Sequence, residues 1–154
     1  MSFVNPFYVV CPDIRSLYNV GAIFRTADAL GVSKLFLCGY TACPPRKEIY
    51  KVALGAERAV PWEHHEQAWR VVDRLKGQGV QVVALEKTPH SVNLFDFEPQ
   101  YPLALVIGNE VDGVPQSLLK RADATVHLPM RGIKESLNVA VAFGAAGYLL
   151  SRWR

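Results

Sequence analysis

Three short segments hold the residue types in this 154-residue chain that could do chemistry. Residues 19–27 (NVGAIFRTA) join an amide to an arginine, a permanent cation that could hold a phosphate. Residues 106–115 (VIGNEVDGVP) place a glycine, an amide and a carboxylate directly after an apolar run. Residues 128–138 (LPMRGIKESLN) begin with apolar residues and end on polar ones. Glycines and polar groups at strand ends are what a small-molecule site needs, since glycine lets backbone approach a ligand closely.

Each segment taken alone also has a purely structural explanation. Asn19 could cap a helix, and Arg25 could be a solvated helix residue. Residues 106–115 could be a strand, a polar turn and a helix with proline at its first position. Ser136 could cap the last helix after a flexible loop. Only the combination of the three segments, in this order, is specific enough to indicate a function.

Other common site signatures are missing from the sequence. There is no G-x-G-x-x-G motif, P-loop or G-x-S-x-G elbow. His64, His65 and Glu66 lack the following histidine that a metalloprotease helix requires. Cys38 and Cys43 lack the second pair that a zinc site requires. We therefore expect no metal.

The elements that must position these segments alternate between strand and helix patterns. Apolar runs at residues 7–11, 34–38, 80–85, 103–107 and 124–128 predict strands, and patterns at 20–30, 68–75, 115–120 and 136–151 predict helices. This alternation predicts a single α/β domain over residues 1–154, with a mostly parallel sheet flanked by helices. Residues 41–64 and 88–102 do not fit, and we interpret the second segment as a surface excursion.

Composition limits the class of protein. The net charge is +3 and half of the residues are hydrophobic, which excludes a disordered chain and a histone-like polycation. Nucleic acid could still bind through a local basic patch. Three cysteines, an odd number, suggest reduced thiols and a cytoplasmic protein. The N-terminus does not resemble a signal peptide, and the longest apolar run, residues 139–150, is too short to span a membrane.

The last helix pattern is apolar on all sides. A helix without a polar face must be buried all round, and a chain of this length offers limited core. We therefore expect a homodimer in which a second copy covers part of residues 139–150.

Together, the N-x-G-A-x-x-R start, the G-N-E-x-x-G centre and the L-P-M…S-L-N end resemble the three motifs of a known family. This family is the SpoU-type (TrmH-type) RNA 2′-O-ribose methyltransferases of the SPOUT superfamily. The resemblance extends over residues 7–152 and includes an L-x-x-A-D element at residues 119–123. It implies an α/β fold with a C-terminal deep trefoil knot, S-adenosylmethionine bound at the knot, and a homodimer.

The resemblance and the strand pattern together indicate a cofactor site. Ligands of parallel sheets bind beyond the carboxyl ends of the strands, where three loops follow the last three strand patterns. Gly108 would let the cofactor approach the backbone, and apolar side chains from residues 128–137 would form a wall. The expected cofactor-binding residues are Leu85, Gly108, Asn109, Gly113, Leu128, Met130 and Leu137.

By the same resemblance, Arg25 is the central catalytic residue, and the residues that assist it are Asn19, Glu110, Ser136 and Asn138. Guanidinium does not lose its proton in proteins, so we expect Arg25 to clamp a phosphate and stabilise a developing alkoxide. Glu110 would orient Arg25 or Asn19. Arg25 follows Phe24 by about 100° around its helix, so it points away from the apolar stripe. It could reach the strand ends of its own chain or, across a dimer, the partner's site.

RNA is the expected substrate, with tRNA favoured slightly over rRNA. Candidate phosphate contacts are Arg46, Lys47, Lys51, Arg58, Arg131 and Lys134, of which the last two flank the third motif. Two alternatives remain open. One is an RNA-binding homologue without transfer activity, and the other is a knotted methyltransferase that acts on an RNA base.

Overall fold

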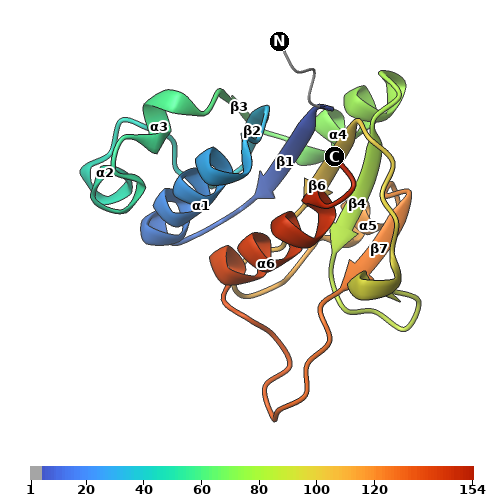
Figure 1. Cartoon of the computed structure of the whole chain (residues 1–154). Helices are drawn as coiled ribbons and strands as arrows, with labels where there is room; N and C mark the ends of the chain where they lie inside the picture. The colour runs from blue at the N-terminus through green and yellow to red at the C-terminus, as the bar shows by residue number, and fades with distance from the viewer. Residues whose placement is uncertain (1–4) are drawn as a thin grey trace.

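A seven-stranded parallel sheet forms the centre of the protein (Figure 1). The computed structural model describes residues 5–154. The strand order is β3-β2-β1-β6-β4-β7-β5, and every neighbouring pair is parallel. The parallel sheet expected from the sequence is therefore confirmed. The strands are β1 (Phe7–Pro12), β2 (Lys34–Cys38), β3 (Trp62–His65), β4 (Gln81–Leu85), β5 (Val92–Asn93), β6 (Leu103–Val106) and β7 (Ala124–His127).

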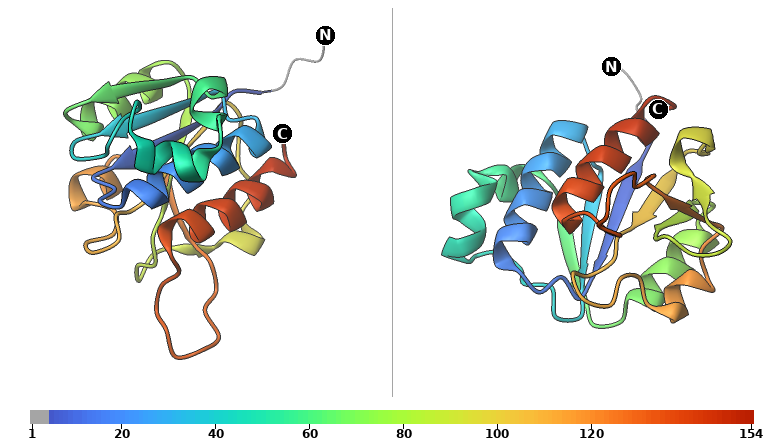
Figure 2. Two further views of the ribbon diagram at one scale, coloured as in Figure 1. Left: turned by 90° about the vertical axis from the view of Figure 1, so that its left-hand side faces the viewer. Right: turned by 90° about the horizontal axis from the view of Figure 1, so that it is seen from below.

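Helices cover both faces of this sheet. They are α1 (Leu17–Leu30), α2 (Lys47–Ala53), α3 (Ala56–Ala59), α4 (Ala68–Gly77), α5 (Gln116–Leu119) and α6 (Val139–Ser151), with a short 3₁₀ turn η1 (Leu94–Asp96). On one face α1 and α6 lie side by side; α4 and α5 lie on the other (Figure 2). Each face of the sheet has its own hydrophobic core: the first lies under α1 and α6, and the second under α4 and α5. Because successive strand residues point to opposite faces, Val9 packs in the first core and Val10 in the second.

Helix α1 has the buried stripe and the terminal glycine that the sequence predicts, but it begins at Leu17, and the expectation that Asn19 caps it is wrong. The Ser16 side chain caps its start by accepting a hydrogen bond from the Asn19 amide. Gly31 ends it in the left-handed conformation, with φ of 66°. Between them Val20 and Phe24 are buried against the sheet. The first motif therefore lies on a rigid helix that packs on the core.

The two segments that did not fit the alternation contain short elements. Residues 41–64 form α2, α3 and β3. Strand β3 has the sequence WEHH and lies at the edge of the sheet, where polar residues remain exposed, so no apolar run marks it. Residues 88–102 are not only a surface excursion, because β5 pairs with β7 and Leu94 of η1 is buried. A two-residue strand gives no periodic signal in the sequence.

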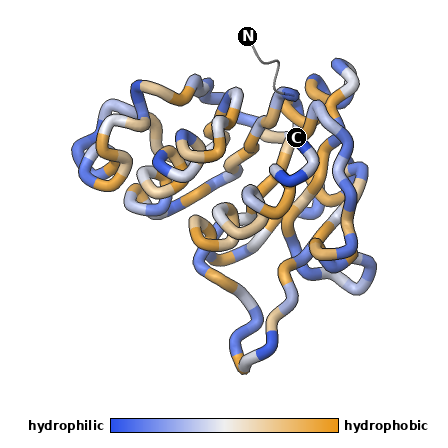
Figure 3. The backbone as a smooth tube through the Cα atoms, in the orientation of Figure 1, coloured by the Kyte–Doolittle hydropathy of each residue, from blue (hydrophilic) through white to orange (hydrophobic). Residues whose placement is uncertain are grey.

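Helix α6 begins later than the sequence suggests. Its cap is Asn138, whose Oδ1 accepts hydrogen bonds from the amides of Ala140 at 2.8 Å and Val141 at 3.2 Å. The expectation that Ser136 caps this helix is therefore wrong. The helix is apolar along most of its length (Figure 3), yet it is covered on one side only. Val141 and Tyr148 are 57% and 58% exposed.

Before α6 the chain makes a long excursion. After β7, residues 128–138 project from the body as a loop, here called the arm, and then return to start α6 beside α1 (Figure 1). No helix within residues 5–154 is long and apolar enough to cross a membrane. The deep trefoil knot implied by the family resemblance stays a prediction.

Close packing of α1 on α2 predicts that an alanine at Gly21 destabilises the protein, although alanine usually stabilises a helix relative to glycine. A Cβ at Gly21 would lie 2.7 Å from the Ile49 carbonyl oxygen and 2.9 Å from Val52 Cβ. We expect Gly21→Ala to lower the free energy of unfolding by about 1–3 kcal/mol, because overpacking outweighs the gain in helix propensity. Gly77→Ala is the control, since its Cβ would meet nothing within 4 Å. Urea denaturation should show it unchanged or stabilised by up to about 1 kcal/mol. Equal effects of the two substitutions would contradict this packing.

Candidate functional site

A cavity of about 560 Å³ lies beyond the carboxyl ends of β4, β6 and β7, beside the start of α6. This is the edge of a parallel sheet where ligands bind. All seven residues expected to bind the cofactor line it: Leu85, Gly108, Asn109, Gly113, Leu128, Met130 and Leu137. The fold thus brings the three predicted loops together. That these residues bind a cofactor stays a prediction.

The floor of the cavity is the turn after β6, here called the GNE loop (residues 108–114). The backbones of Asn109 and Gly113 exchange two hydrogen bonds of 3.2 Å, which close the loop. The Asn109 side chain accepts further bonds from the amides of Val111 and Asp112, at 2.9 and 2.6 Å. Asn109 therefore shapes the loop through its side chain.

Gly108 has a packing role in addition to the one expected from the sequence. A Cβ there would lie 2.6 Å from the carbonyl carbon and 2.7 Å from the Cα of Gly113. The close approach that the structure shows at Gly108 is to its own loop, and the expectation that its missing side chain also admits the cofactor stays a prediction. A larger residue would displace the GNE loop as well as any ligand.

The carboxylate of Glu110 joins the motifs. It accepts hydrogen bonds from the Arg15 and Ser16 amides, both at 3.0 Å, and from Asn19 Nδ2 at 2.9 Å. Asn138 Nδ2 donates in turn to Asn19 Oδ1 at 3.1 Å. These groups, here called the Glu110 junction, connect the loop after β1, the start of α1, the GNE loop and the start of α6. The expected pairing of Glu110 with Asn19 is present in the structure.

The charge of Glu110 follows from these contacts. Partial burial alone would raise its pKa, but the hydrogen bonds from Arg15, Asn19 and Ser16 outweigh burial and lower the pKa from its ordinary value of 4.5. Glu110 is therefore ionised at neutral pH. It acts as a fixed acceptor, and it holds no proton to give to a substrate.

Arg25 lies apart from this cavity. Its side chain is exposed on the outer face of α1, so the expectation that it points away from the apolar stripe is confirmed. It is not among the residues that line the cavity. Within the described residues its guanidinium forms no hydrogen bond or ion pair, so the suggested pairing with Glu110 is wrong in the single chain. Ser136, by contrast, lies on the arm and lines the cavity.

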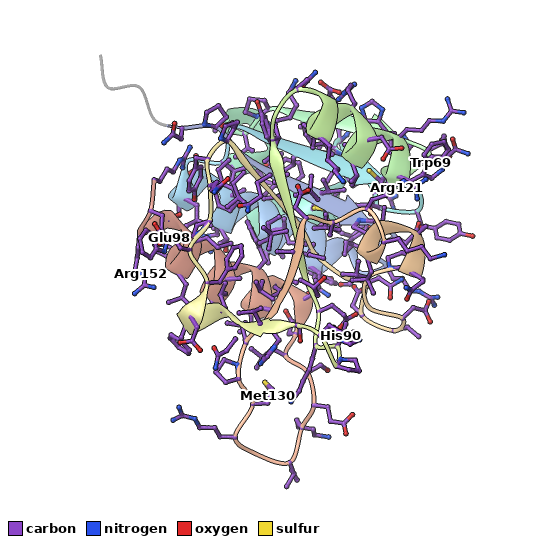
Figure 4. The ribbon with its side chains drawn as sticks, turned by 90° about the vertical axis from the view of Figure 1, so that its right-hand side faces the viewer. Trp69, His90, Glu98, Arg121, Met130 and Arg152 are labelled. Carbon is purple, nitrogen blue, oxygen red and sulfur yellow. The ribbon has the colours of Figure 1, made fainter. Side chains whose placement is uncertain are left out.

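The candidate RNA contacts form two exposed groups. Arg46, Lys47, Lys51 and Arg58 lie on or beside α2 and α3; Arg46 pairs with Glu48 at 3.3 Å. Arg131 and Lys134 lie on the arm, on either side of Ile133, which is 96% exposed. Figure 4 shows Met130 between the two limbs of the arm. The arm thus carries cavity-lining residues at its base and cations at its far end.

Sequence reasoning missed several groups at this site. Glu86 lines the cavity and follows β4 directly, so the rule that ligands bind at strand ends could have found it. Arg15 and Ser16 act through backbone amides, which leave no signal in a sequence. Thr41 is buried, donates to the Cys11 carbonyl at 2.7 Å and accepts from the Ile14 amide at 2.9 Å. It ties the loops after β1 and β2 together.

Metal ligands do not gather in the part of the chain that the structure describes. No group of three or more His, Cys, Asp or Glu residues is placed there to hold an ion. His65 Nε2 instead pairs with Glu63 at 2.8 Å.

Comparison with known proteins agrees with this geometry. The sequence profile of the SpoU rRNA Methylase family matches residues 6–148. The chain belongs to the SpoU family. It is 33% identical over 147 residues to a tRNA (guanosine(18)-2′-O)-methyltransferase of Aquifex aeolicus, covering 95% of this chain and 69% of that protein. Across its curated SpoU relatives, the chain spans between 56% and 69% of their length.

Solved structures of the SpoU family share the fold. One is an AdoMet-bound rRNA methyltransferase from Sinorhizobium meliloti, with a TM-score of 0.88 and 32% identity over 96% of this chain and 56% of that chain. Another is the structure of a protein studied for the 2-OH methylation of C/U34 on tRNA. It has a TM-score of 0.85 and 27% identity, covering 97% of this chain and 96% of that chain.

The Glu110 junction predicts a pH-dependent contribution to stability. Folding lowers the pKa of Glu110, so its contribution is complete above its ordinary value of 4.5 and is lost as pH falls through the lowered pKa. We expect Glu110→Gln to reduce the free energy of unfolding by about 0.5–1 kcal/mol at pH 7, and by progressively less on acidification. Urea denaturation across this pH range measures the difference. Glu98→Gln, at an exposed site, is the control, and a deficit that grew on acidification would contradict the assignment.

Proposed function

We propose that this chain catalyses the S-adenosylmethionine-dependent methylation of a ribose 2′-hydroxyl in RNA. The observation that carries the proposal is the cavity, which collects the expected cofactor residues next to the Glu110 junction. Membership of the SpoU family and the likeness to an AdoMet-bound rRNA methyltransferase support it.

The cavity fits such a cofactor. Its volume of about 560 Å³ lies within the range of small-molecule sites. Leu128, Met130 and Leu137 offer an apolar wall, and the backbone of the GNE loop offers polar groups. When bound, S-adenosylmethionine supplies a methyl group on a sulfonium, which is already a good leaving group. The protein must therefore orient the hydroxyl and favour its ionisation.

Two sets of residues divide this work. Asn138, Asn19 and Glu110 hold the α6 start, the α1 start and the GNE loop in one arrangement, which keeps the cavity in shape. Arg25 supplies the cation. As a guanidinium it stays protonated, so it clamps the phosphate next to the target ribose and stabilises the developing alkoxide. Ser136 lines the cavity on the arm and offers a hydroxyl to the substrate.

A homodimer completes the site in this proposal. Val141 and Tyr148 on α6, together with Tyr18 on α1, leave apolar and aromatic surface exposed, and Arg25 lies on the outer face of α1 beside it. A second copy related by a two-fold axis would cover this surface. Since Arg25 does not line its own cavity, we infer that it acts in the partner's.

The substrate in this proposal is tRNA ahead of rRNA. SpoU relatives of both kinds exist, but the C/U34 tRNA protein matches this chain over nearly its whole length. Arg46, Lys47, Arg131 and Lys134 are the proposed phosphate contacts. The intact Glu110 junction favours a transferring enzyme over a homologue that only binds RNA. The three cysteines are free thiols, which fits a reducing cytoplasm.

Nucleoside analysis tests the proposed function. Total RNA from a strain that lacks the gene is incubated with the protein and S-adenosylmethionine labelled on its methyl group. We expect label in a 2′-O-methylnucleoside of the tRNA fraction. Label in a base would favour the base methyltransferase, and RNA binding without any labelled nucleoside would favour the inactive homologue.

Arg25 generates a direct kinetic prediction. Arg25→Ala should lower single-turnover methyl transfer by about 10²–10⁴-fold, the scale of one positioned catalytic group, and leave cofactor affinity nearly unchanged. Arg25→Lys should recover little, since a point charge cannot reproduce the planar fork on a phosphate. Arg70→Ala, on the opposite face of the sheet, is the control. Near-normal rates in either Arg25 variant would remove its catalytic assignment.

The proposed dimer predicts the effect of a charge on α6. Val141→Glu places a carboxylate in the exposed apolar surface of α6, and sedimentation velocity should show a monomer at micromolar concentration. Trp69→Glu is the control, because Trp69 is 36% exposed on α4, on the opposite face of the sheet from α6. A monomeric wild type, or a dimeric Val141→Glu variant, would argue against this interface.

A further inference from the structure

Glu86 has no role in the site described so far, although it lines the cavity. It follows β4 directly, and β4 pairs with β6, the strand that leads into the GNE loop. Glu86 Oε1 accepts a hydrogen bond of 2.8 Å from the amide of Val114, the last residue of that loop. The carboxylate therefore reaches from one strand end to the loop of its neighbour.

The glycines of the loop make this contact possible. Gly113 has a φ of 69°, and a Cβ there would collide with Glu86 Oε1 and lie 3.0 Å from its carboxyl carbon. A Cβ at Gly108 would in turn lie 2.6 Å from the carbonyl carbon of Gly113. Glu86, Gly113 and Gly108 thus stack without room for any further atom. Because neither Gly108 nor Gly113 has a side chain, the Glu86 carboxylate can lie against the backbone of the GNE loop.

This stack fixes the base of the GNE loop. Val114 is 4% exposed and packs in the second core, so its amide needs an acceptor inside the protein. Glu86 supplies that acceptor through Oε1. The same loop carries Glu110 and contributes its backbone to the cavity. Moving its base would move both.

We propose that Glu86 is a positioning residue that holds the GNE loop in its cofactor-binding shape through the Val114 amide. This inference rests on the proposed function, because it assigns Glu86 a task in the S-adenosylmethionine site. Glu86 acts through the loop and needs only an oxygen that accepts a hydrogen bond. Its negative charge is not required for contact with the cofactor.

Calorimetric titration with S-adenosylmethionine tests the proposal on three variants of the whole chain. We expect Glu86→Ala to raise the Kd about tenfold to one-hundredfold, because the buried Val114 amide is left without its acceptor. Glu86→Gln keeps an oxygen acceptor in the same place, so its Kd should stay within about threefold of wild type. Glu98→Ala is the matched control, since Glu98 is exposed and lies away from the arm (Figure 4). RNA affinity, measured on the same preparations, should be unchanged in all three.

The other possible outcomes of the titration also support or overturn the positioning role of Glu86. A Glu86→Gln variant as weak as Glu86→Ala would show that the cofactor needs the charge itself, which overturns the positioning role. Wild-type affinity in Glu86→Ala would overturn it as well. Should Glu86→Ala fail to fold, Glu86→Gln decides alone, with retained affinity in support and lost affinity against. A wild type that binds no S-adenosylmethionine would remove the proposed function and this inference with it.

Discussion

The carboxylate of Glu110 is the contact on which the geometry of this protein depends. Its bonds to Arg15 and Ser16 cross 95 and 94 residues of sequence, and the bond from Asn138 to Asn19 crosses 119. One ionised side chain therefore fixes the relative position of the loop after β1, the start of α1 and the GNE loop. Through its hydrogen bond with Asn138, Asn19 also fixes the position of the start of α6. A neutral acceptor could satisfy fewer of these donors, which explains why a carboxylate is needed here.

The sheet brings these distant groups together. Because all its strands are parallel, every strand ends at the same edge, and β1, β6, β4 and β7 are consecutive neighbours there. Their loops must meet, so the second and third motifs line one cavity, and Asn19 of the first motif is joined to them through Glu110 and Asn138. Helices α1 and α6 then run side by side from that edge in the same direction: Gly144 lies opposite Thr26, and Gly147 opposite Leu30. Asn19 in the first turn of α1 and Asn138 at the cap of α6 are thereby placed within hydrogen-bonding distance.

How far the sequence predicted this structure depends on the kind of signal. Strand β2 and helix α1 were predictable, because apolar runs, an apolar stripe and a terminal glycine all reflect local burial. The residues of the cavity were predictable from strand ends and the family resemblance. Strand β3 was not, since an edge strand keeps polar residues. Contacts made by backbone amides, such as Arg15 to Glu110, and the packing of Gly108 on Gly113 depend on tertiary structure and leave no pattern in the chain.

The separation of Arg25 from its own cavity makes the catalytic unit, in our account, a pair of chains. Mixed dimers test this claim most directly. One chain carries Arg25→Ala with an intact cavity, and the other carries Gly108→Val, which displaces the GNE loop, with Arg25 intact. Each parent homodimer should be inactive. If Arg25 acts in the partner's cavity, the purified mixed dimer regains about half of the wild-type rate, because one of its two sites is complete. A mixed dimer as inactive as its parents would contradict the account.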